Sequence, residues 1–156
     1  MNKNIVPKTV HEILAHSYLT YFTALVLGLF LDYLYPLRVM SSTLVSIGPL
    51  LLILATVLIF WSQKTSDRTK KHRLDPENLT AKEFRKGPYV YLRSPTHMGL
   101  ALLVLGFGFL SNSVIIVCTA MVTFLVTRYI FVVQEEKILE KKYGKAYEDY
   151  KKIVKF

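Results

Sequence analysis

Long apolar stretches alternate with short polar turns along this chain. A transmembrane helix needs about 20 predominantly apolar residues, and residues 17–35 and 39–61 provide two such stretches. Pro36 separates them, and the turn through Leu37 and Arg38 is short enough to make the two helices antiparallel. The pattern therefore predicts a first hairpin of membrane-spanning helices.

A second pair of apolar stretches lies in the C-terminal half. Residues 96–110 are short for a full span, residues 114–133 are longer, and the polar turn Ser111-Asn112-Ser113 joins them. We therefore expect an all-α integral membrane protein with about four transmembrane helices in two hairpins. Residues 1–156 are expected to form a single transmembrane domain.

Two polar segments complete this pattern. Residues 64–93 are basic and contain the helix breakers Asp75-Pro76 and Gly87-Pro88, which predicts a long loop with at most a short helix. Residues 135–156 carry apolar side chains on one side of a helical pattern that Gly144 interrupts. This amphipathic C-terminal helix is expected to lie on the membrane surface or to pack on the basic loop.

The distribution of charge indicates which side of the membrane each segment faces. The chain has a formal net charge of +9, yet the only charged residues from Ser17 to Gln63 are Asp32 and Arg38. The predicted loop from Lys64 to Arg93 holds nine Lys or Arg. Because positive residues collect in cytoplasmic loops, we place this loop and both termini in the cytoplasm. The topology explains the basic balance, so nucleic-acid binding is not expected.

Other features of the composition narrow the class of protein. The single cysteine, Cys118, lies in an apolar span, so we expect a small buried hydrophobe and neither a disulfide nor a metal site. The first apolar stretch is long and ends in Asp32-Tyr33 without a small-residue cleavage site, so it is expected to stay in the mature protein. The short chain suggests a bacterial or archaeal inner membrane.

Polar residues interrupt the apolar pattern at one membrane mouth. Residues 87–99 enter the third span and residues 128–136 leave the fourth. Because these spans form a tight hairpin, both segments are expected at the same cytoplasmic mouth. Polar groups at such a place are candidates for a functional site.

Each candidate also has a simpler explanation. Glu135 and Glu136 suit a cationic or hydroxyl-rich ligand, or ordinary ion pairs at a helix exit. Arg128 lies two turns before Glu135, on about the same helix face, and otherwise extends toward lipid headgroups. His97 suits a proton carrier, or an interfacial histidine bonded to the backbone. For Gly106-Phe107-Gly108 we expect close helix packing.

Taken in order, these segments resemble the membrane methyltransferases related to isoprenylcysteine carboxyl methyltransferase and phospholipid methyltransferases. That family carries Gly-Pro-Tyr, Arg-His-Pro followed by an aromatic residue and a glycine, a helical hairpin, a Glu-Glu pair, and a tail of tyrosines beside a glycine. The matching residues, within about 87–150, are Gly87-Pro88-Tyr89, Arg93-Ser94-Pro95, Gly99, Glu135-Glu136, Tyr143-Gly144, Tyr147 and Tyr150. The ordered combination is specific, whereas the first two spans match only in being apolar.

The resemblance implies an enzyme that uses S-adenosylmethionine to methylate a lipophilic acceptor at the cytoplasmic membrane face. The acceptor would be an isoprenylcysteine-like carboxylate or a phospholipid amine. An amine must first lose a proton, so it calls for a base such as His97 or Glu136, whereas a carboxylate needs none. By resemblance, the cofactor-binding residues are Tyr89, Arg93, Pro95, His97, Gly99, Glu135 and Glu136.

The sequence departs from the family pattern at two positions. Ser94 stands where the family has histidine, and His97 stands where it has an aromatic residue. If Pro95 begins a helix, positions 94 and 97 share a face. We therefore hypothesise that His97 places an imidazole near the position where the family has its histidine. Two alternatives stay open: a nicotinamide-dependent membrane reductase, which resembles the same region, and a non-catalytic membrane protein that retains the fold.

Overall fold

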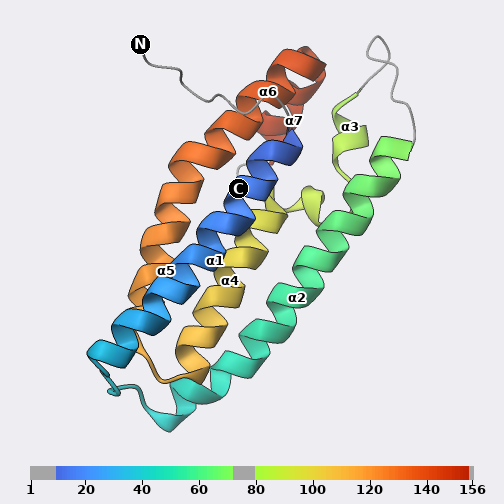
Figure 1. The fold of residues 1–156 in the computed structure, drawn as a ribbon. Coiled ribbons are helices and arrows are strands. Elements are labelled where there is room, and N and C mark those ends of the chain that lie inside the picture. The colour runs from blue at the N-terminus through green and yellow to red at the C-terminus, as the bar shows by residue number, and fades with distance from the viewer. Residues whose placement is uncertain (1–9, 72–79, 155–156) are drawn as a thin grey trace, which may run out of the picture.

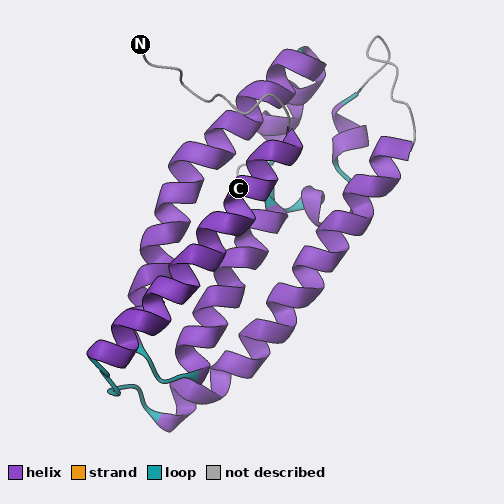
Figure 2. Cartoon of the chain, in the orientation of Figure 1, coloured by secondary structure: helices purple, strands orange, loops and turns teal. Residues whose placement is uncertain are grey.

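The computed structural model describes residues 10–71 and 80–154, and every regular element within those ranges is helical (Figures 1 and 2). In chain order the elements are α1 (Val10–Leu34), α2 (Ser42–Lys71), α3 (Ala81–Phe84), η2 (Gly87–Val90), α4 (Pro95–Leu110), α5 (Val114–Thr127), η3 (Arg128–Val132), α6 (Val133–Tyr143) and α7 (Lys145–Ile153). The prediction of an all-α membrane fold is confirmed.

Helices α1, α2, α4 and α5 run alongside one another as a bundle (Figure 1). Helix α4 packs against α2 and α5, and α1 packs against α5 and α4. The buried core between them includes Tyr21, Leu100, Val104 and Ile116. Three helical segments are long and apolar enough to cross a membrane, namely Glu12–Leu34, Ser42–Ser66 and Val114–Tyr143, and Pro95–Leu110 is a shorter apolar helix.

The outer surface of this bundle is apolar. Phe22 on α1, Phe60 on α2 and Val122 on α5 are each more than 60% exposed. A continuous apolar surface of this kind is what a lipid bilayer covers. Cys118 also lies on the exposed surface, so the prediction that it is buried is wrong. It faces outward because α5 turns its small core residues, such as Ala120, toward the other helices.

Two helices extend beyond the predicted spans. The first helix begins at Val10 rather than near residue 17, and the second continues through Lys71 rather than ending near residue 61. The start of the predicted basic loop is therefore helical. An apolar window marks the part of a helix inside the membrane, whereas backbone hydrogen bonds continue into water without apolar side chains.

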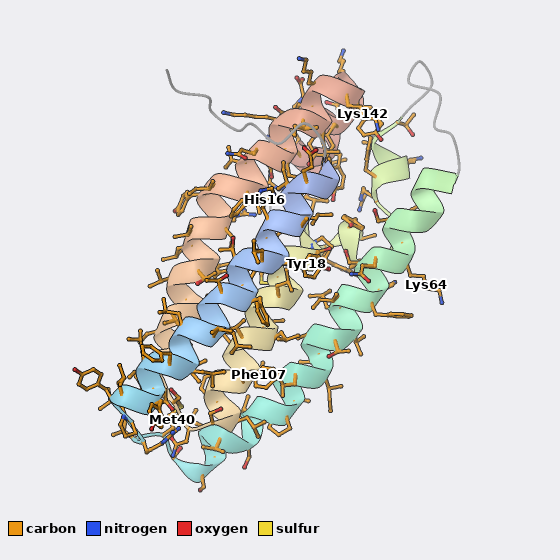
Figure 3. The ribbon with its side chains drawn as sticks, viewed as in Figure 1. His16, Tyr18, Met40, Lys64, Phe107 and Lys142 are labelled. Carbon is orange, nitrogen blue, oxygen red and sulfur yellow. The ribbon has the colours of Figure 1, made fainter. Side chains whose placement is uncertain are left out.

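One end of the bundle is held by a buried carboxylate. Asp32 accepts hydrogen bonds from Ser113 at 2.5 Å and from Arg38 at 2.7 Å, and Arg38 also donates to the Ser111 carbonyl. Asn112 turns the chain between α4 and α5 with a positive φ of 53°. These bonds connect the two hairpin turns, at the end of the bundle where Figure 3 shows Met40.

Glycines allow α2 and α4 to approach closely. A Cβ added at Gly48 would lie 2.6 Å from the Leu110 nitrogen, and one at Gly106 would lie 2.9 Å from a Leu52 methyl. Both distances are too short for real contacts. The glycines of the predicted third span therefore serve helix packing.

The opposite end carries the polar elements. Helices α6 and α7, the start of α1 and the short α3 lie together there (Figure 1), and Figure 3 shows Lys142 at this end. Gly144, with φ of 54°, lets α7 fold back after α6. Tyr147 and Tyr150 are then buried against Phe84 of α3. This packing matches the predicted amphipathic C-terminal helix.

Candidate active site

The Gly-Pro-Tyr segment forms one wall of the site because it lies directly on α2. Gly87 has φ of 57°, and a Cβ there would lie 2.5 Å from the Thr65 hydroxyl. Only glycine fits both the conformation and the space. The turn that follows brings the Tyr89 hydroxyl 3.1 Å from Ser62, whose Oγ lies 2.8 Å from Thr96 on α4.

Helix α7 supports the same wall. The Tyr150 hydroxyl donates to the Tyr89 carbonyl at 2.8 Å. Burial raises the pKa of both tyrosines. Both hydroxyls are therefore protonated near neutral pH, and Tyr150 keeps its hydrogen bond across that range. The C-terminal tyrosines of the chain thus position the Gly-Pro-Tyr turn.

Arg93 and Glu136 form an ion pair at the edge of the site. Their charged atoms lie 3.0 Å apart, and each side chain is 15% exposed. Lys151 of α7 lies 3.2 Å from the other oxygen of Glu136 and 2.6 Å from Glu140. Glu136 is therefore held between two cations, which engage both of its carboxylate oxygens.

His97 is buried inside the bundle and contacts two helices. Its Nε2 lies 2.9 Å from Ser17 Oγ on α1, and its Nδ1 lies 3.6 Å from Glu135 Oε2. Ser17 donates its proton to the Ile13 carbonyl at 3.0 Å. Its oxygen must therefore accept from Nε2–H, which leaves the lone pair of a neutral imidazole on Nδ1, facing Glu135.

Glu135 supplies an unmatched acceptor. Its Oε2 accepts no hydrogen bond from the described residues, although it is buried. A buried carboxylate oxygen without a donor is costly unless a ligand supplies one. Glu135 lines a cavity together with Val10, Leu14, Ser66, Tyr89, Arg93, Ser94, Pro95, Thr96 and His97. Polar and charged groups of both signs thus surround one cavity.

A second cavity adjoins the first. Its wall is mostly apolar and is made by Leu92, Ser94, His97, Met98, Phe124, Thr127, Arg128 and Val132. Ser94 and His97 line both cavities. These two residues therefore form the boundary between a polar cavity and an apolar one.

A known protein family matches a large part of this chain. A sequence model described as Phospholipid methyltransferase matches residues 43–146, which is more than half of the chain. The chain belongs to the phospholipid methyltransferase family. No curated protein and no solved structure matches it. Membership supports methyl transfer to a lipid, and it confirms the family predicted from the sequence.

Most of the family's expected cofactor residues meet in the structure. Tyr89, Arg93, Pro95, His97 and Glu135 line the polar cavity. Glu136 lies behind it, paired with Arg93.

Gly99 lies apart from the cavities, on the side of α4 that faces α2. A Cβ there would lie 2.6 Å from Ile59. The lack of a side chain at Gly99 serves helix packing, and Gly99 lines neither cavity.

Arg128 and Glu135, which the sequence predicts on about the same helix face, line two adjoining cavities that share Ser94 and His97. Arg128 lines the apolar cavity and Glu135 lines the polar one. The π-helical turn η3 lies between them. Such a turn holds an additional residue, which rotates the following side chains relative to an uninterrupted α-helix.

Three site residues were not singled out from the sequence. Ser17 and Ser62 lie in the first two spans, which resemble the family only in being apolar, and Lys151 follows the tyrosine tail. Serine and lysine are common at such positions, so no sequence signal marks them. The family match begins at residue 43, yet α1 supplies the hydroxyl that contacts His97.

Proposed function

We propose that this protein transfers a methyl group from S-adenosylmethionine to a lipid at the cytoplasmic face of the membrane. One observation carries the proposal: among the described residues, the buried oxygen of Glu135 has no donor in a cavity that also presents Arg93. An amino-acid cofactor with an ammonium and a carboxylate offers the complementary groups. The donor set of the cavity therefore fits S-adenosylmethionine.

Each wall of the polar cavity has a role in this proposal. Glu135 accepts from the ammonium of the cofactor, and Arg93 binds its carboxylate. Tyr89 and Pro95 shape the apolar part of the cavity. When bound, the cofactor supplies a methyl group already activated on a sulfonium. The protein then needs mainly to orient the partners and exclude water.

His97 is proposed as the base for an amine acceptor. Ser17 fixes the tautomer, so the lone pair of the neutral ring lies on Nδ1. A proton taken there creates an imidazolium that Glu135, 3.6 Å away, stabilises. Glu136, predicted as a second catalytic residue, is instead a positioning residue, because its carboxylate is paired with Arg93 and Lys151.

The membrane orientation follows from the same end of the bundle. The polar cavity, the basic end of α2 and the Lys-rich helices α6 and α7 lie together. Basic segments stay on the cytoplasmic side. We therefore propose that the cavity opens to the cytoplasm of a bacterial or archaeal inner membrane, where a soluble cofactor has access.

Calorimetry of S-adenosylmethionine binding to the purified protein in phospholipid nanodiscs tests this function. Wild type is expected to bind saturably. Arg93→Ala should weaken binding about tenfold or more, because it removes a charged hydrogen-bond donor. Arg38→Ala is the matched control, since Arg38 also pairs with a carboxylate but lies at the other end of the bundle.

The control variant should bind the cofactor as wild type does. Saturable binding must also be accompanied by transfer of labelled methyl into lipid. Well-folded wild type that binds no S-adenosylmethionine would overturn the proposal. That outcome would favour a non-catalytic member of the family.

A further inference from the structure

Among the described residues, the wall of the apolar cavity between α4 and α5 includes one positively charged side chain. Its wall includes Leu92, Met98, Phe124 and Val132, and Arg128 is the only charged residue among its described lining. Ser94, His97 and Thr127 provide the other polar groups of this wall. The cavity thus combines an acyl-chain-like surface with a single guanidinium.

Arg128 is placed there at a cost. It lies within the apolar segment Val114–Tyr143, is half-buried, and forms no hydrogen bond or ion pair with the described residues. A charged side chain inside a span is expensive and marks a functional position. A cation held without a carboxylate is suited to an anionic ligand.

The backbone directs Arg128 into the cavity. The π-helical turn η3 begins at Arg128, and the next residue, Tyr129, is 74% exposed on the outer surface. Single π turns inside helices occur frequently at functional sites. If Arg128 only extended toward lipid headgroups it would lie on that outer surface, as Tyr129 does, rather than in a cavity wall.

We infer that this cavity is the acceptor site, and that Arg128 binds the phosphate of an aminophospholipid headgroup. The inference rests on the proposed function and assigns the residue that recognises the phosphate of its lipid acceptor. A planar guanidinium matches a phosphate with paired hydrogen bonds. The apolar residues receive the acyl chains, and the headgroup amine reaches His97 at the boundary of the two cavities.

In an ethanolamine headgroup a short spacer joins the phosphate to the amine, so one cavity holds both of these groups. Phosphate and amine are neighbours in such a headgroup, and Arg128 and His97 are neighbours in the cavity wall. Arg128 would thereby select lipids with a phosphate, whereas His97 acts on the amine. Recognition and proton removal are assigned to different residues, and because the charge of Arg128 also acts on His97, KM and not kcat reports recognition.

Methyl transfer in nanodiscs tests the inference with two acceptors. One is phosphatidylethanolamine and the other is a long-chain alkylamine without phosphate. Arg128→Gln should raise KM for phosphatidylethanolamine about tenfold or more and leave KM for the alkylamine within about twofold. Arg128→Lys should fall between wild type and Arg128→Gln, because the charge remains and the paired geometry is lost. Lys137→Gln is the matched control, since Lys137 is an exposed cation on α6 outside both cavities.

Retention of phospholipid, followed by native mass spectrometry, gives a readout besides activity. Wild type and Lys137→Gln should retain phosphatidylethanolamine, and Arg128→Gln should lose it. Calorimetric binding of S-adenosylmethionine should be equal in all of these proteins.

Equal KM and equal lipid retention in Arg128→Gln and Lys137→Gln would overturn the inference while methyl transfer itself stands. The inference would also be overturned if Arg128→Gln raised KM for a farnesylated cysteine carboxylate and left KM for phosphatidylethanolamine unchanged. Arg128-dependent retention in a protein that transfers no methyl group would instead overturn the proposed function and keep the phosphate site.

Discussion

The two ends of the bundle each place a carboxylate near an arginine, but the hydrogen bonds to the two carboxylates differ. At the turn end, Asp32 accepts from Ser113 and Arg38. At the cavity end, Glu135 Oε2 accepts no hydrogen bond from the described residues, and Arg93 is paired with the neighbouring Glu136. A buried carboxylate whose partners are all supplied by the protein stabilises the fold, whereas one with an open oxygen keeps binding capacity for a ligand.

The two carboxylate clusters also differ in their position relative to the cavities. The Asp32 cluster joins two hairpin turns and lines neither of the two cavities described above. The Glu135 cluster joins α1, α4 and α6 around a cavity. Substitutions at the first end should therefore change stability, and those at the second should change activity.

The largest expected effect is loss of the base. His97→Ser should lower kcat for an amine acceptor about 100-fold, because general-base catalysis contributes factors of this size. Adding Ser94→His should restore part of the activity, since Ser94 also lines both cavities. Initial rates with labelled cofactor measure both. Full activity in His97→Ser alone would show that His97 is not the base.

Asp32→Asn should have the next largest effect, on stability alone. It weakens the bonds to Ser113 and Arg38, so the free energy of unfolding should fall by about 2–3 kcal/mol. Titration with a denaturing detergent measures this change. Activity per folded molecule should stay near wild type. A large loss of activity with unchanged stability would remove the distinction between the two ends.

Glu135→Gln should give the reverse result. Since Oε2 accepts no hydrogen bond from the part of the chain that the structure describes, the free energy of unfolding should change by less than about 1 kcal/mol. The rate should fall about tenfold, because neither the cofactor ammonium nor an imidazolium at His97 is stabilised as well. Unfolding measured beside Asp32→Asn provides the comparison. Destabilisation as large as in that variant would make Glu135 a structural residue.

The smallest expected effect concerns Ser17. Ser17→Ala removes the acceptor of Nε2–H, so the tautomer of His97 is less strongly set and kcat should fall about threefold to fivefold. KM for the cofactor should not change. Thr20→Val is the control, because the Thr20 hydroxyl donates to the His16 carbonyl within α1. Equal rates in both variants would show that Ser17 does not position the imidazole.

Much of this architecture could be predicted from the sequence. Hydropathy is a local property, so four apolar helices, two hairpins and a basic end could be derived from runs of residues alone. The positions of Gly87, Arg93 and Glu135 could be assigned to one mouth, because short turns force neighbouring spans together. Helix ends at Val10 and Lys71 could not, since hydropathy marks the membrane and not the end of hydrogen bonding.

The sequence by itself thus determined the helices, their pairing and the family motifs, whereas only the tertiary structure decided which polar groups meet. Ser17 reaches His97 from a helix that carries no family motif. The π turn after Thr127 separates Arg128 from Glu135, and Lys151 folds back to hold Glu136. The physical reason is rotation: which side chain of a helix faces a cavity depends on packing and on a single extra residue per turn, and neither changes the hydropathy of the chain.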